Sequence, residues 1–440
     1  MIELKILEAA ISEIADLARA HGLDFFPMRF EICPADVIYA FSAYGMPGRF
    51  SHWSFGKAYY RIKKQYDYGL NRICEMVINT DPCYAFLLES NSPLQNKLVI
   101  AHTLAHSDFF KNNAYFGQTA RDMVEMMALA ADRIRGYEAL YGRDQVEQFL
   151  DAVLAIQEHV DPHPFSRKRS AAGDKPHGPC TPDESIRRDR ESAAGTALEG
   201  CEPEKDLLWF IAEHAPELAD WERDIVQIVH REALYFWPQL TTKFLNEGWA
   251  TYWHTRLLRK LDLDDSEVIE FARVQAELLQ PGKLCPNPYL TGLRILESVE
   301  RRYGREKLFE VRAEENDVSF IRSYLTEDLV KELDIYVYRL VGQDWRVAVK
   351  EWEKVREALL INLINGGHPY IVVADGNYSR RGELYLRHIF EKLELDVHHL
   401  ERALCHVYRL WKRPVHLETV LDGQRVVFRC SKEGVSKSFG

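Results

Sequence analysis

Apolar residues recur at intervals of three and four over most of residues 1–322, which predicts a mainly helical region. Residues 1–22 carry an apolar stripe interrupted by acidic side chains, the pattern of an amphipathic helix. Ser92 and Pro93 supply an N-cap and a first helical residue for a helix over 92–110. Further helices are expected at 119–141, 144–158, 204–215, 216–235, 240–261, 266–279 and 289–303.

Strand signals gather in two regions. Residues 75–88 are rich in apolar and aromatic side chains and are broken at Asp81-Pro82, which predicts two strands or one bulged strand. From about residue 323, β-branched and aromatic residues cluster between turn signals. This texture predicts a C-terminal α+β domain over 323–440, with strands at 336–341, 370–374, 415–421 and 425–430 and helices at 382–393 and 400–411.

A domain boundary is expected at residues 161–203. This stretch holds six prolines and many serines, glycines and charges, but almost no large apolar side chains. Such a segment cannot bury enough surface to offset its ordering entropy, so it is predicted to be a disordered insertion. It divides a helical core into a first part, 1–160, and a second part, 204–322.

Composition excludes several classes of protein. The apolar content of 46% suffices for a packed interior, and no apolar run approaches the ~20 residues that span a bilayer. The acidic N-terminal helix lacks the basic start of a signal peptide, and the eight cysteines include no C-x-x-C pair, so we expect a cytoplasmic protein without a disulfide framework. The net charge of −11 argues against a nucleic-acid partner.

The chemistry of the chain is expected around two histidines, His102 and His106. On a helix they project from one face a turn apart, as when one helix supplies two ligands to a zinc ion. The spacing alone is weak, because 16 histidines in 440 residues give roughly half such a pair by chance. The alternative interpretation is a pair of hydrogen-bonded, partly buried histidines. Asp108 lies close by and is predicted to orient a ligand.

A second helix offers an acid, Glu247, among apolar residues. A buried carboxylate needs a partner, which is either a metal ion shared with the two histidines or a salt bridge to Arg121 or Lys111. His254 follows seven residues later, about 10 Å along the helix, so it is expected to line the cleft or to act on a substrate. Three ligands would leave an open coordination position, as in catalytic zinc sites.

The order of these elements resembles that of zinc peptidases whose third ligand is a glutamate. Those enzymes carry His-Glu-x-x-His, in which the glutamate is the general base. Thr103 occupies that position here, and a hydroxyl cannot accept the proton at neutral pH. Asp108, His52 and His254 are the candidate substitutes. No nucleotide-binding or serine-hydrolase motif occurs in the sequence.

Several longer blocks resemble the stage V sporulation protein R (SpoVR-like) family over about residues 10–425. They are His-Trp-Ser-Phe-Gly-Lys at 52–57, Glu-Met-Val-Ile-Asn at 75–79, the 102–113 segment ending Asp-Phe-Phe-Lys-Asn-Asn, Asn-Glu-Gly-Trp-Ala at 246–250, Asn-Pro-Tyr at 287–289 and Gly-Glu-Leu-Tyr-Leu at 382–386. The resemblance implies a role in spore cortex formation or, outside spore formers, in stress adaptation. It also implies work beside a PrkA-type serine protein kinase and a von Willebrand-like partner.

Two hypotheses follow. The first is a protein with a zincin-like cleft in which His102, His106 and Glu247 hold a divalent metal, zinc first and manganese or iron as alternatives. It would hydrolyse a peptide or peptidoglycan-precursor bond, with His52 or His254 handling a proton or the substrate. The second is a non-catalytic scaffold that docks a kinase, which Thr103 favours. An iron site for redox chemistry would use the same three ligands.

Overall fold

The computed structural model describes residues 2–67, 75–162, 203–282 and 284–439. Contacts between Cα atoms divide the chain into two units. Unit 1 comprises residues 1–141 and 235–367, and unit 2 comprises 142–234 and 368–440, so helix α9 (Asp220–Thr241) contains a boundary. Most of the predicted insertion at 161–203, residues 163–202, lies outside the described residues.

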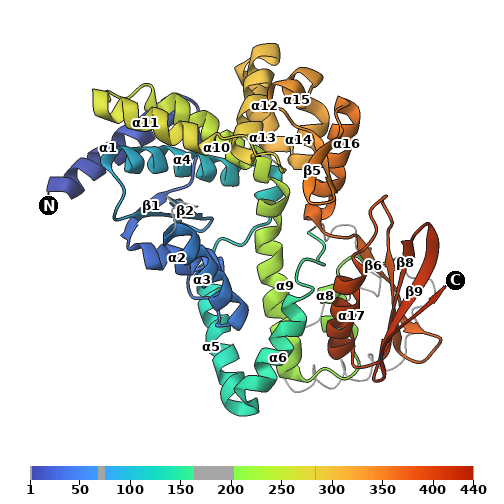
Figure 1. Ribbon diagram of the computed structural model, residues 1–440. Coiled ribbons are helices and arrows are strands. Elements are labelled where there is room, and N and C mark those ends of the chain that lie inside the picture. Colours follow the sequence, from blue (N-terminus) through green and yellow to red (C-terminus); the bar gives the residue numbers. More distant parts are fainter. Residues whose placement is uncertain (1, 68–74, 163–202, 283, 440) are drawn as a thin grey trace, which may run out of the picture. The chain divides into compact units, whose positions relative to one another are not determined.

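Unit 1 is built mainly of helices around one small sheet (Figure 1). The sheet has the order β1-β3-β2, with β1 (Met28–Cys33) parallel and β2 (Glu75–Ile78) antiparallel to β3 (Cys83–Leu88). A separate hairpin is formed by β4 (Val337–Val341) and β5 (Asp344–Val349). The helices are α1 (Ile2–Ala20), α2 (Ala35–Tyr44), α3 (Trp53–Asp67), α4 (Pro93–Asn112), α5 (Met123–Tyr141), α10 (Lys243–Leu258), α11 (Asp265–Leu278), α12 (Pro288–Tyr303), α13 (Arg305–Glu314), α14 (Asp317–Tyr324), α15 (Glu327–Glu332) and α16 (Trp352–Leu363), with short 3₁₀ turns at Ala114–Phe116 and Ile364–Gly367.

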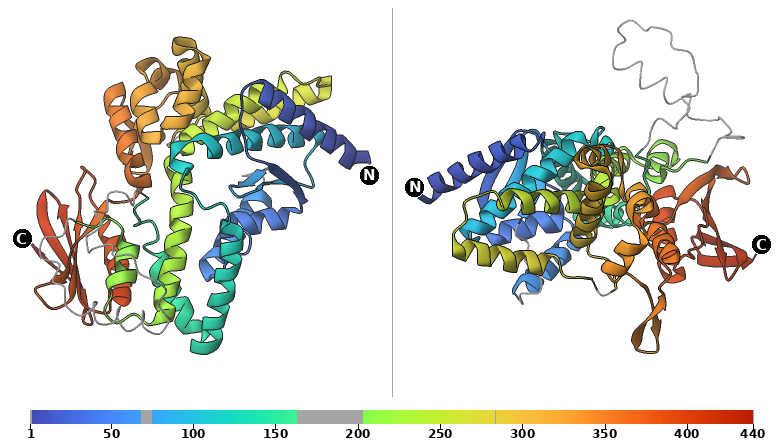
Figure 2. Two further views of the ribbon diagram at one scale, coloured as in Figure 1. Left: turned by 180° about the vertical axis from the view of Figure 1, so that it is seen from behind. Right: turned by 90° about the horizontal axis from the view of Figure 1, so that it is seen from above.

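Helix α4 is the centre of unit 1. Every residue from Leu98 to Phe110 is buried, so the helix is enclosed on all sides. It contacts α1, α10, α11 and α13 as well as β2 and β3, and the views in Figures 1 and 2 agree in this arrangement. Polar side chains on such a helix must find partners inside the protein, which makes its histidines informative.

The crossing of α10 and α12 depends on two glycines. A Cβ atom added to Gly248 would lie 2.5 Å from the backbone carbon of Gly292, and one added to Gly292 would lie 2.1 Å from the carbonyl oxygen of Phe244. Only residues without side chains allow two helix backbones to approach this closely. The close approach fixes the position of α10, the helix that carries Glu247.

Unit 2 contains a five-stranded sheet of order β10-β9-β8-β7-β6, in which only β7 and β8 pair in parallel. Its elements are α6 (Arg143–Leu154), α8 (Leu207–His214), the start of α9, β6 (Ile371–Tyr378), β7 (Glu383–His388), α17 (Val397–Trp411), β8 (Val415–Leu421), β9 (Gln424–Ser431) and β10 (Gly434–Phe439). Helix α17 packs on β8, β9 and β10. The chain is thus mainly helical with small sheets and a sheet-rich C-terminal part, as an α+β assignment requires.

Two sequence predictions differ from the structure. The helix predicted at 382–393 is wrong, because residues 383–388 form strand β7 between β6 and β8. Leu384, Leu386 and His388 are buried at every second position, and this alternation outweighs the helix propensity of the segment. Residues 323–367, predicted as the start of the C-terminal domain, group with unit 1, where Val355 is part of the core.

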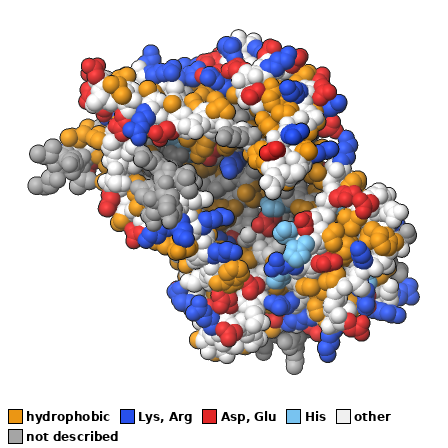
Figure 3. Space-filling view, viewed as in Figure 1, with side chains coloured by type: hydrophobic (Ala, Val, Ile, Leu, Met, Phe, Trp, Pro, Cys, Tyr) orange, Lys and Arg blue, Asp and Glu red, His pale blue; other side chains and the backbone are white. Residues whose placement is uncertain are grey.

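Over the described part of the face in Figure 3, basic and acidic side chains are interspersed among apolar ones. Among the described helices, none is long and apolar enough to cross a membrane.

Candidate metal centre

The two histidines of interest are held by a well-formed helix. Ser92 caps α4: its hydroxyl accepts a hydrogen bond from the Gln95 backbone N–H (3.1 Å), and the Gln95 side chain accepts one from the Ser92 N–H (3.0 Å). Further along α4, the rings of His102 and His106 lie 4.6 Å apart and are 1% and 5% exposed. The predicted helix and its cap are therefore confirmed, and both imidazoles are buried.

Helix α10 brings Glu247 to the same point. Asp317 accepts hydrogen bonds from the backbone N–H groups of Phe244 (2.9 Å) and Leu245 (3.0 Å) at the start of this helix. Glu247 Oε2 then lies 3.7 Å from His102 Nε2 and 3.6 Å from His106 Nε2. The three atoms that could bind a metal ion all lie within 4.8 Å of one another.

His106 is oriented by its neighbour on α10. Its Nδ1 lies 2.8 Å from Asn246 Oδ1, and an amide oxygen can only accept a hydrogen bond, so Nδ1 carries the proton. The lone pair of the ring is then on Nε2, the atom that faces Glu247. Metal-ligating histidines use the same arrangement, in which the far nitrogen donates to a fixed acceptor.

His102 is oriented by a longer chain of hydrogen bonds. Its Nδ1 lies 2.7 Å from His254 Nδ1, and His254 Nε2 lies 2.9 Å from Gln275 Oε1. In the orientation of the Gln275 amide in this structure, its nitrogen donates to Thr255 Oγ1 (2.9 Å) and its oxygen faces His254 Nε2.

The tautomers follow from this assignment. His254 donates from Nε2 to Gln275, so its Nδ1 accepts from His102 Nδ1–H. His102 therefore also presents the lone pair of Nε2 toward Glu247. Three side chains on α10 and α11, those of His254, Thr255 and Gln275, thus set the protonation pattern of His102.

The electrostatics of the cluster suit a cation. Burial raises the pKa of Glu247, but interactions with His102 and His106 in their protonated forms outweigh burial and lower the pKa overall, so the carboxylate is ionised. A bound cation would take the place of those protons and leave both rings neutral. Burial, with the neighbouring His102, lowers the pKa of His254 to about 3, so this imidazole is neutral. The cluster combines two imidazole nitrogens with one negative carboxylate, a donor set that zinc, manganese and iron accept.

One carboxylate oxygen of Glu247 indicates that the cluster lacks a positively charged partner among the described residues. Glu247 Oε2 is buried and makes no hydrogen bond with any described residue, although the whole side chain is 20% exposed. A buried anionic oxygen without a donor is costly, and a bound cation between it and the two imidazole nitrogens would satisfy it. The residues therefore fit a divalent metal ion.

The two cations considered as salt-bridge partners of Glu247 make other interactions. Lys111 pairs with Asp24 at 2.5 Å. Arg121 donates to the carbonyl oxygen of Thr80, and its guanidinium lies over the ring of Phe26.

The other predicted site residues lie apart from the three ligand atoms. The carboxylate of Asp108 accepts hydrogen bonds from Trp249 Nε1 (2.9 Å) and Arg312 Nη1 (2.8 Å), and burial raises its pKa to about 6 against the effect of Arg312. Its expected role is corrected here, because Asn246 and His254 make the orienting hydrogen bonds.

The remaining two candidates are the histidines proposed to handle a proton or the substrate. His254 is 0% exposed and lies behind His102. His52 Nδ1 lies 2.7 Å from Ser54 Oγ, and its ring packs on Trp53 and Phe55. Neither of these described environments includes Glu247.

Sequence reasoning did not identify three neighbours of the cluster. Asn246 adjoins Glu247 in a block that was used only for the family resemblance. Gln275 has no motif around it. Tyr289 follows the helix N-cap Asn287, and its half-buried ring lies 6.2 Å from the His102 ring, inclined by 31°. The sequence feature that could have identified Asn246 is its position as a polar residue directly beside the predicted ligand Glu247.

Comparison with known proteins assigns the class. Residues 2–368 match the family described as SpoVR like protein, and residues 369–422 match the SpoVR-like C-terminal domain. The chain therefore belongs to the SpoVR family. It is 30% identical to the uncharacterised protein YcgB of Escherichia coli (strain K12) over 474 residues, which cover 94% of this chain and 91% of that protein. No solved structure matches it.

Proposed function

We propose that this SpoVR-family chain is a metalloprotein in which His102, His106 and Glu247 hold one divalent ion, zinc first and manganese or iron as alternatives. The observation that carries the proposal is the convergence of three ligand atoms within 4.8 Å, one of them a buried carboxylate oxygen without a hydrogen-bond donor. The hydrogen bonds of both Nδ1 atoms support it, because they leave the two Nε2 lone pairs for the ion.

The reaction class we propose is hydrolysis in a zincin-like site. Three protein ligands leave a coordination position open, and the bound ion supplies a Lewis acid that polarises a carbonyl group or a water. Glu247 is the least buried ligand, so substrate is expected to approach from its side. The bond that we propose as the target is a peptide or peptidoglycan-precursor bond, because the family resemblance implies a role in forming the spore cortex.

This site differs from known zinc peptidases in the residue available as a general base. Thr103 Oγ1 donates to the carbonyl oxygens of Val99 (2.8 Å) and Ile100 (3.2 Å) within its own helix and is fully buried. It therefore cannot take up a proton from a substrate water. The buried position of His254 suits a residue that positions His102 rather than one that touches substrate.

A second candidate function follows from Thr103. A metal site without a base beside it would serve structure or regulation, in a scaffold that works with a PrkA-type serine kinase and a von Willebrand-like partner. In both versions the proposed biological setting is spore cortex formation or stress adaptation, and in both the metal is held by the same three residues. Turnover of peptide or muropeptide substrates by the metal-loaded protein separates them.

Metal analysis of the full chain, purified without an affinity tag, tests the proposal. We expect close to one zinc, manganese or iron per chain, and loss of that metal in a His102→Ala, His106→Ala variant. The matched control is His398→Ala, His399→Ala, which removes two exposed neighbouring histidines of α17 and should retain the metal. A metal-free wild-type protein that also takes up none of the three ions on titration would refute the proposal.

A further inference from the structure

Two cysteines of unit 2 have their sulfur atoms in contact. Cys405 Sγ on α17 lies 3.8 Å from Cys430 Sγ on β9. Cys405 is exposed, whereas Cys430 is 2% exposed. Of the five cysteines that the structure describes, these are the two that approach each other. An exposed thiol beside a buried one is the arrangement in which the first can react with an external oxidant and the second can close a disulfide.

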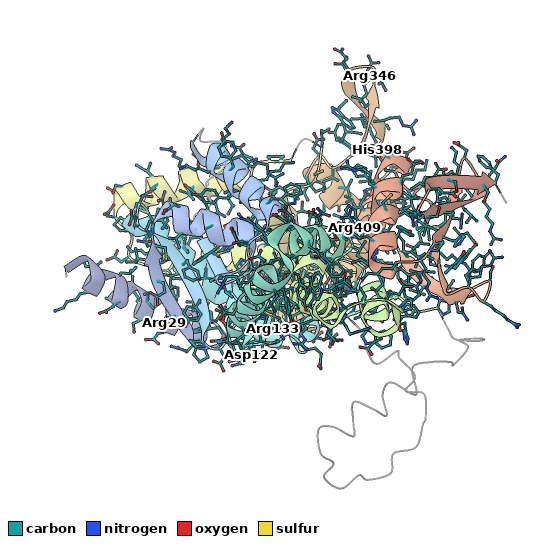
Figure 4. All side chains as sticks on the ribbon, turned by 90° about the horizontal axis from the view of Figure 1, so that it is seen from below. Arg29, Asp122, Arg133, Arg346, His398 and Arg409 are labelled. Atoms are coloured by element: carbon teal, nitrogen blue, oxygen red, sulfur yellow. The ribbon has the colours of Figure 1, made fainter. Side chains whose placement is uncertain are left out.

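The secondary structure holds both cysteines in place. Cys430 is one of three buried residues at alternate positions of β9, so it lies on the packed face of this strand. Helix α17, on which Figure 4 labels His398 and Arg409, packs on β8, β9 and β10. Cys405 directly follows the buried Leu404 and therefore lies at the border between the packed and the exposed face of the helix.

A small movement separates this contact from a covalent bond. The sulfur atoms of a disulfide are about 2.0 Å apart, so the two sulfurs, now 3.8 Å apart, must approach by about 1.8 Å. Rotation by roughly 30° about each Cα–Cβ bond moves each sulfur by about 0.9 Å. Adjustment of the two side chains is therefore large enough to close the gap.

We infer that Cys405 and Cys430 form a reversible disulfide, with a low-molecular-weight disulfide such as glutathione disulfide as the oxidant. The Cys405 thiolate bonds to one glutathione sulfur, the S–S bond of the oxidant breaks, and one glutathione leaves and takes up a proton. Cys430 then loses its proton to solvent and attacks the Cys405 sulfur, which releases the second glutathione. Two protein thiols and one glutathione disulfide thus give one protein disulfide and two glutathione thiols.

The burial of the two thiols sets the order of these steps. Burial and the neighbouring Cys405 raise the pKa of Cys430, so this thiol stays protonated and does not begin the exchange. The exposed position of Cys405 gives the oxidant access to its sulfur. Once Cys405 carries glutathione, Cys430 is already beside it, and the second step is intramolecular.

The bond would close a ring around residues 406–429, which include β8 and most of β9. A ring of this kind restricts the unfolded chain more than the folded chain, so oxidation should stabilise the sheet-rich part of unit 2. The inference does not depend on metal binding or on catalysis by unit 1.

Peptide mapping of the full chain tests the site after incubation with reduced and oxidised glutathione, acid quenching and alkylation of free thiols. In excess glutathione disulfide we expect the tryptic peptides 403–409 and 430–432 to be linked and to separate on reduction. Cys405→Ser should abolish the link. The matched control is Cys285→Ser, which removes another exposed cysteine and should retain it. A map without this linked pair, or one that links Cys405 to a different cysteine, would overturn the inference.

Hydrogen exchange measures what the bond does to the fold. Amides of β8 and β9 should exchange on the order of 10–100-fold more slowly in the linked chain than in the reduced chain. Cys405→Ser under the same oxidising conditions should remove the difference, and because Cys405 is exposed this variant should keep the exchange pattern of the reduced wild type. Equal exchange in the linked and reduced chains would overturn the stabilising role of the disulfide.

Discussion

The close crossing of α10 and α12 leads to a prediction in which the same substitution has opposite effects at two sites. Gly248→Ala introduces a methyl group 2.5 Å from the backbone carbon of Gly292 and 2.6 Å from its Cα. Gly136→Ala, in the middle of α5, introduces the same methyl group where nothing lies within 4 Å. Both glycines are inside helices, so the change in helix propensity is the same.

The magnitudes follow from the two distances. Non-bonded carbon atoms are most stable about 3.5–4.0 Å apart, so Gly248→Ala forces the helices apart by roughly 1 Å. Overpacking costs about 1–3 kcal/mol, and a clash with backbone atoms, which cannot turn aside like a side chain, lies in the upper part of that range, about 2–3 kcal/mol. The better helix propensity of alanine returns about 1 kcal/mol. We expect a net loss of on the order of 1–2 kcal/mol for Gly248→Ala and a gain of about 0.5–1 kcal/mol for Gly136→Ala.

Hydrogen exchange followed by mass spectrometry is the suitable assay, because it gives opening free energies for separate helices. Peptides from α10 and α12 should lose protection in Gly248→Ala, whereas peptides from α5 should gain it in Gly136→Ala. Equal protection of α10 in wild type and Gly248→Ala, or an increase, would refute the described helix crossing.

Three further predictions concern the polar groups around the site. Arg312→Met leaves the buried Asp108 carboxylate without its cation, and the free energy of unfolding in urea should fall by about 3 kcal/mol or more; a change within 0.5 kcal/mol would contradict this. Burial raises the pKa of Asp317 to about 7, above the ~3.9 of an unfolded aspartate. The folded state therefore binds this proton more tightly than the unfolded state, and the contribution of Asp317 to stability falls as the pH rises from about 4 to 7. Comparing unfolding at pH 5 and pH 8 should therefore show a difference, on the order of 2 kcal/mol, that Asp317→Asn removes; an identical pH dependence in the variant would exclude Asp317 as its source. Gln275→Ala removes the acceptor of His254 Nε2, and zinc affinity in a chelator competition titration should fall roughly 10–100-fold; an unchanged affinity would contradict the tautomer assignment.

Local signals in the sequence predicted the start of α4 in unit 1 and strand β8 in unit 2. Ser92 and Pro93 fixed the start of α4 because a cap and a first-turn proline act within a few residues, and the structure confirms both. Residues 415–421 were predicted as a strand with the observed bounds of β8. The segment 383–388 was misassigned because its alternation is short and its leucines and glutamate also suit a helix.

The parts of the site that depend on helix packing could not be predicted. Helix geometry alone places His102 and His106 on one face of α4. Their approach to Glu247, however, requires α10 to cross α4 at the level of these two histidines. The contact between Gly248 and Gly292 that fixes α10 joins positions far apart in sequence. Gln275 reaches His254 only because α11 folds back along α10, and no local pattern contains that information.

The most direct test of the metal centre is an anomalous difference map from crystals of the full chain grown with zinc or manganese and measured at the absorption edge of that metal. We predict one strong peak about 2.0–2.2 Å from His102 Nε2, His106 Nε2 and a carboxylate oxygen of Glu247. A map with no peak between α4 and α10, in crystals that show the three side chains clearly, would contradict it.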